Sequence, residues 1–116
     1  MLGMHGTLEA NLAIHHADLV VCVGARFDDR VTGTLQTFCP QARKIHIDID
    51  PSSIGKTVKV DAPLVGDCAV VLQALLAMPQ LHALPPARLA PWWERIDRWR
   101  ARDSLGFAAR SDVIPP

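Results

Sequence analysis

The polar, glycine-rich segments that could bind a ligand are three short charged segments: residues 24–30 (GARFDDR), 48–50 (DID) and 66–67 (GD). Arg26 in the first segment suits a pyrophosphate, because its guanidinium can donate two parallel hydrogen bonds. Asp48 in the second could accept hydrogen bonds from ribose hydroxyls. Two alternatives stay open, namely an internal ion-pair network within GARFDDR and simple turn formation by Asp48. Together these residue types favour a nucleotide-binding site.

A fourth segment, Gly3-Met4-His5-Gly6, directly precedes a predicted helix. Free N–H groups and the helix dipole at such a position favour an anion such as a phosphate. A GxxG sequence is also typical of an ordinary turn, and that alternative stays open.

The other reactive side chains have no spacing typical of a catalytic or metal site. Cys22, Cys39 and Cys68 lie far apart without a CxxC pair, and the five histidines include no HExxH sequence. Asp28 and Asp29 would point to opposite sides of an extended chain, so they are no acid–base pair. We therefore predict no catalytic residue and no metal site. The cysteine pattern indicates a reducing, cytoplasmic compartment.

The apolar pattern predicts strands that end where the charged segments begin. Residues 19–23 (LVVCV) form a continuous β-branched run, typical of a strand buried on both faces of a parallel sheet. Residues 44–49 (KIHIDI) alternate and stop before Pro51, and residues 59–65 form a short extended piece. Because ligands collect at the carboxyl ends of parallel strands, the three segments should meet at one edge of the sheet.

Two predicted helices complete an α/β alternation. Residues 7–17 are mostly good helix formers, and Asp67 is placed to cap a second helix over residues 68–78, which Pro79 closes.

Prolines become frequent near residue 79, where the composition changes. We predict a partial α/β domain over residues 1–79 and a Pro-rich linker over 80–116 that carries one amphipathic helix, residues 91–102. Trp92 and Trp99 would lie on the apolar face of that helix. This face docks either on another domain or subunit or back on its own domain, and both alternatives stay open.

The overall composition excludes several classes of protein. The 116 residues are 49% apolar and carry 12 Lys+Arg against 12 Asp+Glu, a formal net charge of zero. This balance argues against a nucleic-acid partner, which would require a basic excess. No apolar run approaches the roughly 18 residues of a membrane span, so we predict no membrane partner either.

Two long strings closely resemble the central domain of acetolactate synthase (acetohydroxyacid synthase) large subunits. They are LGMHGTLEANLAIHHADLVVCVGARFDDRVTG, residues 2–33, and KIHIDIDPSSIGKTVKVDAPLVGD, residues 44–67. The most specific parts are GARFDDRVTG and HIDIDP. WWERIDRWRARDSLGF (92–107) and SDVIPP (111–116) resemble the linker that follows this domain in the family.

The resemblance implies an α/β fold: a parallel-sheet, Rossmann-like (DHS-like NAD/FAD-binding) central domain of thiamine-diphosphate enzymes, N-terminally truncated in this chain. Such enzymes decarboxylate pyruvate on thiamine diphosphate and add the two-carbon unit to a second pyruvate or to 2-oxobutanoate. This reaction opens branched-chain amino-acid biosynthesis. The resemblance further implies a structural FAD, Mg²⁺ with the diphosphate, a homo-oligomer and a regulatory small subunit as partner.

The resemblance also assigns FAD and substrate contacts to positions of this sequence. The implied contacts of the flavin are Gly3, Met4, His5 and Gly6. Those around the ribityl and pyrophosphate groups are Gly24, Ala25, Arg26 and Asp28, with Arg30 and Val31 nearby. Those at the adenosine end are Asp48, Ile49, Gly66, Asp67 and Cys68. The implied substrate-channel residues are Met4, His5, Asp29 and Arg30, of which Arg30 would meet a substrate carboxylate.

Other parts of the family's machinery have no counterpart in this sequence. The glutamate that activates thiamine and the GDG…N segment that binds Mg²⁺ belong to the family's other domains, and its first FAD-domain strands precede the point that matches Met1. We therefore expect weak FAD binding, no carboligase activity from this chain alone, and self-association through an exposed sheet edge and the tryptophan helix. The alternatives are a stand-alone nucleotide-binding module and a structural module without a ligand.

Overall fold

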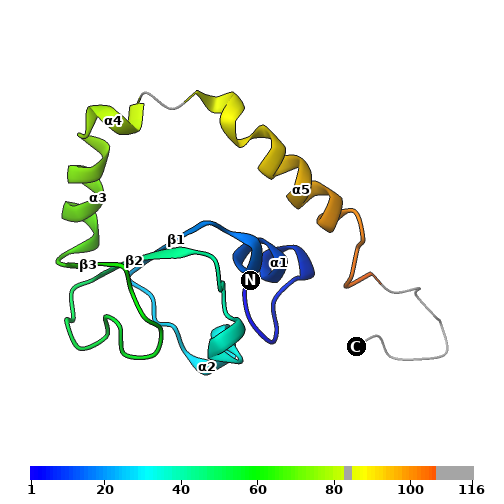
Figure 1. Ribbon diagram of the computed structural model, residues 1–116, viewed down its shortest axis with the longest axis horizontal. Coiled ribbons are helices and arrows are strands. Elements are labelled where there is room, and N and C mark those ends of the chain that lie inside the picture. The colour runs from blue at the N-terminus through cyan, green and yellow to red at the C-terminus, as the bar shows by residue number, and fades with distance from the viewer. Residues whose placement is uncertain (83–84, 107–116) are drawn as a thin grey trace.

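A parallel sheet of three strands forms the centre of the computed structural model, which describes residues 1–82 and 85–106 (Figure 1). The strands are β1 (Leu19–Val23), β2 (Arg43–Asp48) and β3 (Ala62–Val65), in the order β1-β2-β3. Both pairings are parallel. The predicted α/β class with a parallel sheet is therefore confirmed, and the strands lie within a few residues of the predicted ranges.

The main helices lie where the sequence predicts them. They are α1 (Leu8–His16), α3 (Cys68–Leu76) and α5 (Ala90–Arg100). The carboxylate of Asp67 accepts hydrogen bonds from the first free amides of α3, at 2.8 and 3.1 Å, which confirms the predicted cap. Pro79 does end the run of α3, but it also begins a further short helix, α4 (Pro79–His82).

Besides α4, three short helical segments were not predicted. One is α2 (Asp29–Thr32), which lies within the charged segment after β1. The other two are the 3₁₀ helices η1 (Leu35–Thr37) and η2 (Pro86–Leu89). None exceeds four residues, a length at which apolar periodicity carries no signal.

Strand β1 is buried on one face only, so the prediction of burial on both faces is wrong. Cys22 is 8% exposed, but Leu19, Val21 and Val23 are each at least 37% exposed. These three alternate with Cys22 and therefore point to the opposite face. β1 forms the edge of the sheet, and among the described residues no helix covers its outer face.

The apolar core lies on the face of the sheet to which Cys22 points. Its buried members are Cys22, Phe27, Phe38, Cys39, Ala42 and Val58. The rings of Phe27 and Phe38 meet edge to face, with their centroids 5.8 Å apart. Ile14 of α1 packs against this cluster, which fixes α1 beside the sheet.

Helix α5 packs against α1 of the same chain (Figure 1). The Trp99 side chain is 8% exposed, stacks on the His16 ring with 5.5 Å between centroids, and meets Trp92 edge to face at 6.0 Å. Of the two alternatives for the tryptophan face, docking within its own chain is therefore the one observed. Trp99 is therefore covered within its own chain, and self-association stays a prediction for which the exposed apolar side chains of β1 are available.

Within residues 1–82 and 85–106, no helix is both long and apolar enough to cross a membrane. The string SDVIPP and the last residue of the string before it lie outside the described residues. The boundary near residue 79 stays a prediction.

Candidate functional site

The three charged segments meet at the carboxyl edge of the sheet, as predicted. The Gly24 amide donates to the Ile47 carbonyl at 2.8 Å, and the Gly66 amide donates to the Asp48 carbonyl at 2.9 Å. These bonds continue the parallel ladder past the ends of β1 and β3. They therefore bring Gly24, Asp48 and Gly66, which are far apart in sequence, to one edge.

Close contact between Gly24 and the start of α3 tightens this edge. Gly24 has a φ of +56°, and a Cβ built there would lie 3.3 Å from the Cys68 sulfur. That sulfur lies 3.9 Å from the Ile47 carbonyl, to which its thiol donates a weak hydrogen bond. A side chain at position 24 would be strained and crowded, so glycine keeps the backbone open to a ligand here.

Asp48 forms a turn and still keeps an oxygen available. Its Oδ1 accepts the Asp50 amide at 2.9 Å, while no described residue bonds its Oδ2. Asp50 in turn accepts the amide and the hydroxyl of Ser52, both at 2.9 Å. These bonds lower the pKa of Asp50, which keeps this carboxylate ionised. Ile49 lies between the two acids and is 70% exposed, an apolar surface beside the free Asp48 oxygen.

Arg26 and Asp28 line a pocket of about 360 Å³ beside this edge. The other lining residues are Phe27, Asp50, Ser52, Ser53, Lys56 and Thr57. Asp28 also caps α2 by accepting the Val31 amide at 3.1 Å. Among the described residues the sole ion pair joins Arg100 to Asp97, so the alternative of an ion-pair network within GARFDDR is wrong. No ion pair within residues 1–82 and 85–106 involves the guanidinium of Arg26.

The GMHG segment is a turn in which three of the four amides are already bonded, so the expectation of free N–H groups is wrong for Gly3, Met4 and Gly6. The Gly3 amide donates to the Asn11 side chain at 2.8 Å, and the Met4 amide donates to the Arg30 carbonyl at 3.0 Å. The Gly6 and Thr7 amides donate to the carbonyls of Gly3 and Met1. Asn11 and Arg30 belong to α1 and α2, so only the folded chain reveals that the Gly3 and Met4 amides are used.

The same bonds place the GMHG segment against α2. Gly3 has a φ of +85°, and a Cβ there would clash with the Arg30 carbonyl and come within 3.0 Å of the Val31 backbone. Glycine at position 3 is thus required for the close approach. The contact unites the predicted substrate-channel residues Met4, Asp29 and Arg30, which line one pocket, whereas His5 does not line it.

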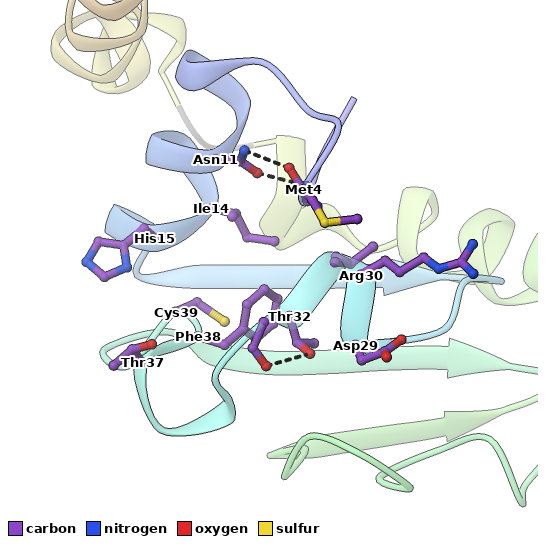
Figure 2. A pocket seen from close by; sticks show the side chains of 13 residues that line it. Met4, Asn11, Ile14, His15, Asp29, Arg30, Thr32, Thr37, Phe38 and Cys39 are labelled. Atoms are coloured by element: carbon purple, nitrogen blue, oxygen red, sulfur yellow. Dashed lines mark hydrogen bonds between the residues drawn. The ribbon is translucent and has the colours of Figure 1, made fainter.

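A pocket of about 600 Å³ lies between α1, α2 and η1 (Figure 2). Of the predicted site residues, Gly3, Met4, Asp29, Arg30 and Val31 line it. The lining residues that sequence reasoning missed are Asn11, Ile14, His15, Thr32, Gly33, Thr37, Phe38 and Cys39. Figure 2 shows the Arg30 side chain extending away from His15 and Phe38, in the direction in which the strands run. Its guanidinium is thus directed toward the carboxyl edge.

One buried side chain near the edge was missed altogether. His46 of β2 is 1% exposed, and its Nε2 lies 2.9 Å from the Ala25 carbonyl. A histidine in an alternating strand gives no sign of such a contact, because its partner follows another strand. The predicted residues therefore fall into two groups, one around GMHG and α2 and one at the strand ends, which the segment 24–30 joins. No group of three or more metal-ligating side chains occurs among the described residues.

Comparison with known proteins gives a consistent match along the whole chain. Residues 1–75 match the family model described as the central domain of thiamine pyrophosphate enzymes. The chain is 48% identical over 118 aligned residues to the acetolactate synthase isozyme 3 large subunit of Escherichia coli (strain K12), covering 100% of this chain and 21% of the relative. It is 49% identical over 117 to the acetolactate synthase large subunit of Haemophilus influenzae, covering 100% and 20%. The relative in Parasynechococcus marenigrum is 46% identical over 116, with 100% and 19% covered. The chain thus spans about a fifth of the length of these relatives.

Proposed function

The chain belongs to the thiamine pyrophosphate enzyme family, whose central domain it matches, and we propose that it is the FAD-binding part of an acetolactate synthase large subunit. The observation that carries this proposal is the convergence of Gly24, Asp48 and Gly66 at one sheet edge. That edge is where parallel α/β sheets bind nucleotides. The identity of 48% and 49% to two acetolactate synthase large subunits supports the choice of enzyme.

The residues at the strand ends fit the adenosine half of FAD. The free Oδ2 of Asp48 is an acceptor for ribose hydroxyls, and the exposed Ile49 is an apolar surface for the adenine ring. Gly66, Asp67 and Cys68 close this end of the site. Because Asp67 already caps α3, its role is to hold the helix start in place.

The segment after β1 fits the ribityl and pyrophosphate groups. Arg26 has no ion-pair partner among the described residues, so its guanidinium can pair with phosphate oxygens. Gly24 and Ala25 let the ligand approach the backbone, and Asp28 fixes the start of α2. Arg30 and Val31 follow on that helix, next to the turn that contains Gly3.

The GMHG turn and α2 are proposed to face the flavin and the substrate channel. Gly3, Met4, His5 and Gly6 would contact the flavin by their side chains and carbonyls, since most amides of the turn are already bonded. Met4, His5, Asp29 and Arg30 would line the channel. The guanidinium of Arg30 points toward the strand ends (Figure 2), where it can bind the carboxylate of a 2-oxo acid.

The reaction proposed for the whole enzyme joins two pyruvates, or pyruvate and 2-oxobutanoate, into an acetohydroxy acid with release of CO₂. Thiamine diphosphate with Mg²⁺ supplies the decarboxylation and carbon–carbon bond chemistry, and we propose that residues outside this chain bind both. FAD shapes the site without transferring electrons. The enzyme would be a cytoplasmic homo-oligomer with a regulatory small subunit, acting in branched-chain amino-acid biosynthesis.

FAD binding by the purified 116-residue chain tests this proposal. We expect weak but saturable quenching of FAD fluorescence, measured up to high chain concentration, with about tenfold weaker binding by Arg26→Met because a charge-assisted contact to phosphate is lost. Arg98→Met, on the exposed surface of α5, is the matched control and should bind like the wild type. A wild-type chain that does not quench FAD, or an Arg26→Met variant that binds equally well, would overturn the assignment.

Two further measurements address the chain by itself. We expect no acetolactate from pyruvate and thiamine diphosphate, and any formed by the purified chain would show that it carries catalytic groups of its own.

We also expect self-association through the outer edge of β1, whose apolar side chains are exposed. A single monomeric species in sedimentation at tens of micromolar would exclude this edge contact.

A further inference from the structure

The carbonyl of Ala25 accepts hydrogen bonds from two buried side chains. The Cys22 thiol lies 3.0 Å from this oxygen, and Nε2 of His46 lies 2.9 Å from it. Cys22 and His46 are register partners on β1 and β2, and they are 8% and 1% exposed. Two adjacent strands thus hold one peptide group of the loop that follows β1.

The contact with a carbonyl fixes which ring nitrogen of His46 donates. A carbonyl oxygen only accepts, so Nε2 must carry a proton. Nδ1 is buried without a hydrogen-bond partner in the described part of the chain. Phe27 packs its ring against His46 with 5.2 Å between centroids, which limits rotation of the imidazole. Because the unpaired Nδ1 is unfavourable, the bond to Ala25 is the one polar contact that accounts for a histidine here.

The inward carbonyl of Ala25 determines the direction of the next N–H group. All peptide bonds of the described chain are trans, so the Arg26 N–H points opposite to the Ala25 carbonyl. The carbonyl is directed inward at Cys22 and His46, and the Arg26 N–H is therefore directed outward. No described residue accepts from this amide. The loop presents a backbone donor next to the Arg26 guanidinium.

We propose that Cys22 and His46 are positioning residues that hold the Ala25–Arg26 peptide with its N–H toward the diphosphate of a bound dinucleotide. The two side chains touch no ligand themselves. They act by preventing the peptide from turning over, which would exchange the outward donor for an outward carbonyl that repels phosphate. This inference rests on the proposed FAD site.

Paired substitutions separate this role from simple core packing. His46→Gln keeps an amide N–H near the position of Nε2, whereas His46→Met keeps the length of the side chain and removes the donor. Cys22→Ser and Cys22→Ala form a second pair of the same kind, which serves if the histidine variants do not fold. Val58→Ala, in the same core cluster but away from Ala25, is the control for general loosening.

The binding of FAD and of riboflavin, which lacks phosphate, is measured by flavin fluorescence for each folded variant. We expect His46→Met and Cys22→Ala to bind FAD about tenfold more weakly and riboflavin unchanged. The Gln and Ser variants should stay within about twofold of the wild type, and Val58→Ala should lower stability without this selectivity. Equal losses for both flavins, or equal losses in donor-keeping and donor-removing variants, would mean that the residues only pack the core.

The nitrogen spectrum of the His46 ring in the ligand-free chain is an independent test. We expect a proton on Nε2, and a ring protonated on Nδ1 alone would overturn the anchor even if FAD binds. If the wild-type chain does not bind FAD, the proposed function fails and the ligand role proposed here fails with it. If the wild type binds FAD and all variants bind it equally, this inference alone fails.

Discussion

Strands β1 and β2 have similar apolar sequences and pair along their length, yet they lie in different surroundings. Val23 and Ile47 are register partners, but Val23 is 37% exposed and Ile47 is completely buried. β2 has a strand on each side and α3 packs against it, whereas β1 has one neighbouring strand. An apolar run shows that a strand can be buried, and the neighbouring elements determine whether it is.

The contrast applies to one face of β1 only. Cys22 lies on the other face and is buried, as is its register partner His46 on β2. Its thiol contacts the loop that carries Arg26. The proposed binding loop therefore depends on the closed face of the sheet. The open face of β1 carries no residue of the candidate site.

The largest effect is expected when the two register partners are each shortened. Ile47→Ala should lower the free energy of unfolding by about 3 kcal/mol, because it leaves a cavity in a fully buried position. Val23→Ala should lower it by about 1 kcal/mol or less, since its side chain already contacts solvent. Urea unfolding of both variants measures the difference. Equal losses would show that the outer face of β1 is covered in solution.

The strand positions and the main helices followed from the sequence because local signals determine them. The β-branched run of β1 and its closing glycine predicted a strand, and Asp67 predicted the start of α3; the structure has both. The carboxyl-edge site followed as well, because parallel strands must end on the same side. These features need no knowledge of distant contacts.

Features that depend on distant partners did not follow from the sequence. The Gly3 and Met4 amides of the GMHG turn donate to Asn11 and to the Arg30 carbonyl, so they are not the free donors that the phosphate interpretation expected. The outer face of β1 is exposed because no described helix packs on it, which the sequence of the strand itself does not reveal. The contact of His46 with Ala25 joins the middle of one strand to the loop after another. In each case the local sequence was compatible with both a free and a bonded, or a buried and an exposed, position of the same residues.

An intermediate effect is expected in thiol labelling, which probes the closed face of β1 directly. Cys22 and Cys39 are buried, and burial raises the pKa of both thiols, so each has little reactive thiolate. Cys68, at the start of α3, is less buried. An aromatic disulfide reagent at pH 8 should therefore label Cys68 at least about tenfold faster than Cys22 and Cys39. Cys68→Ser should remove the fast phase, and fast labelling of Cys22 would show that both faces of β1 are open.

The smallest effect is expected at the contact between α1 and α5, which tests whether α5 also shields β1. Desolvation against Trp99 lowers the pKa of His16, and the positive charge of Arg95 lowers it further. The unfolded chain then binds a proton on this histidine more readily than the folded chain does. The stability from this group is therefore complete above its ordinary pKa of 6.5 and is lost as the pH falls from there through the lower folded value.

Tryptophan fluorescence between pH 7.5 and 5 follows this loss, since Trp99 stacks on the His16 ring. We expect a shift toward exposed tryptophan that is absent in His16→Phe, which keeps an aromatic ring without a titrating group. Because α5 contacts α1 and leaves the outer face of β1 exposed, the labelling rate of Cys22 relative to that of Cys68 should stay unchanged over the same pH range, since both rates fall with the thiolate fraction. A parallel rise in Cys22 labelling would mean that release of α5 opens the sheet, and the separation between the two faces of β1 would then depend on that helix.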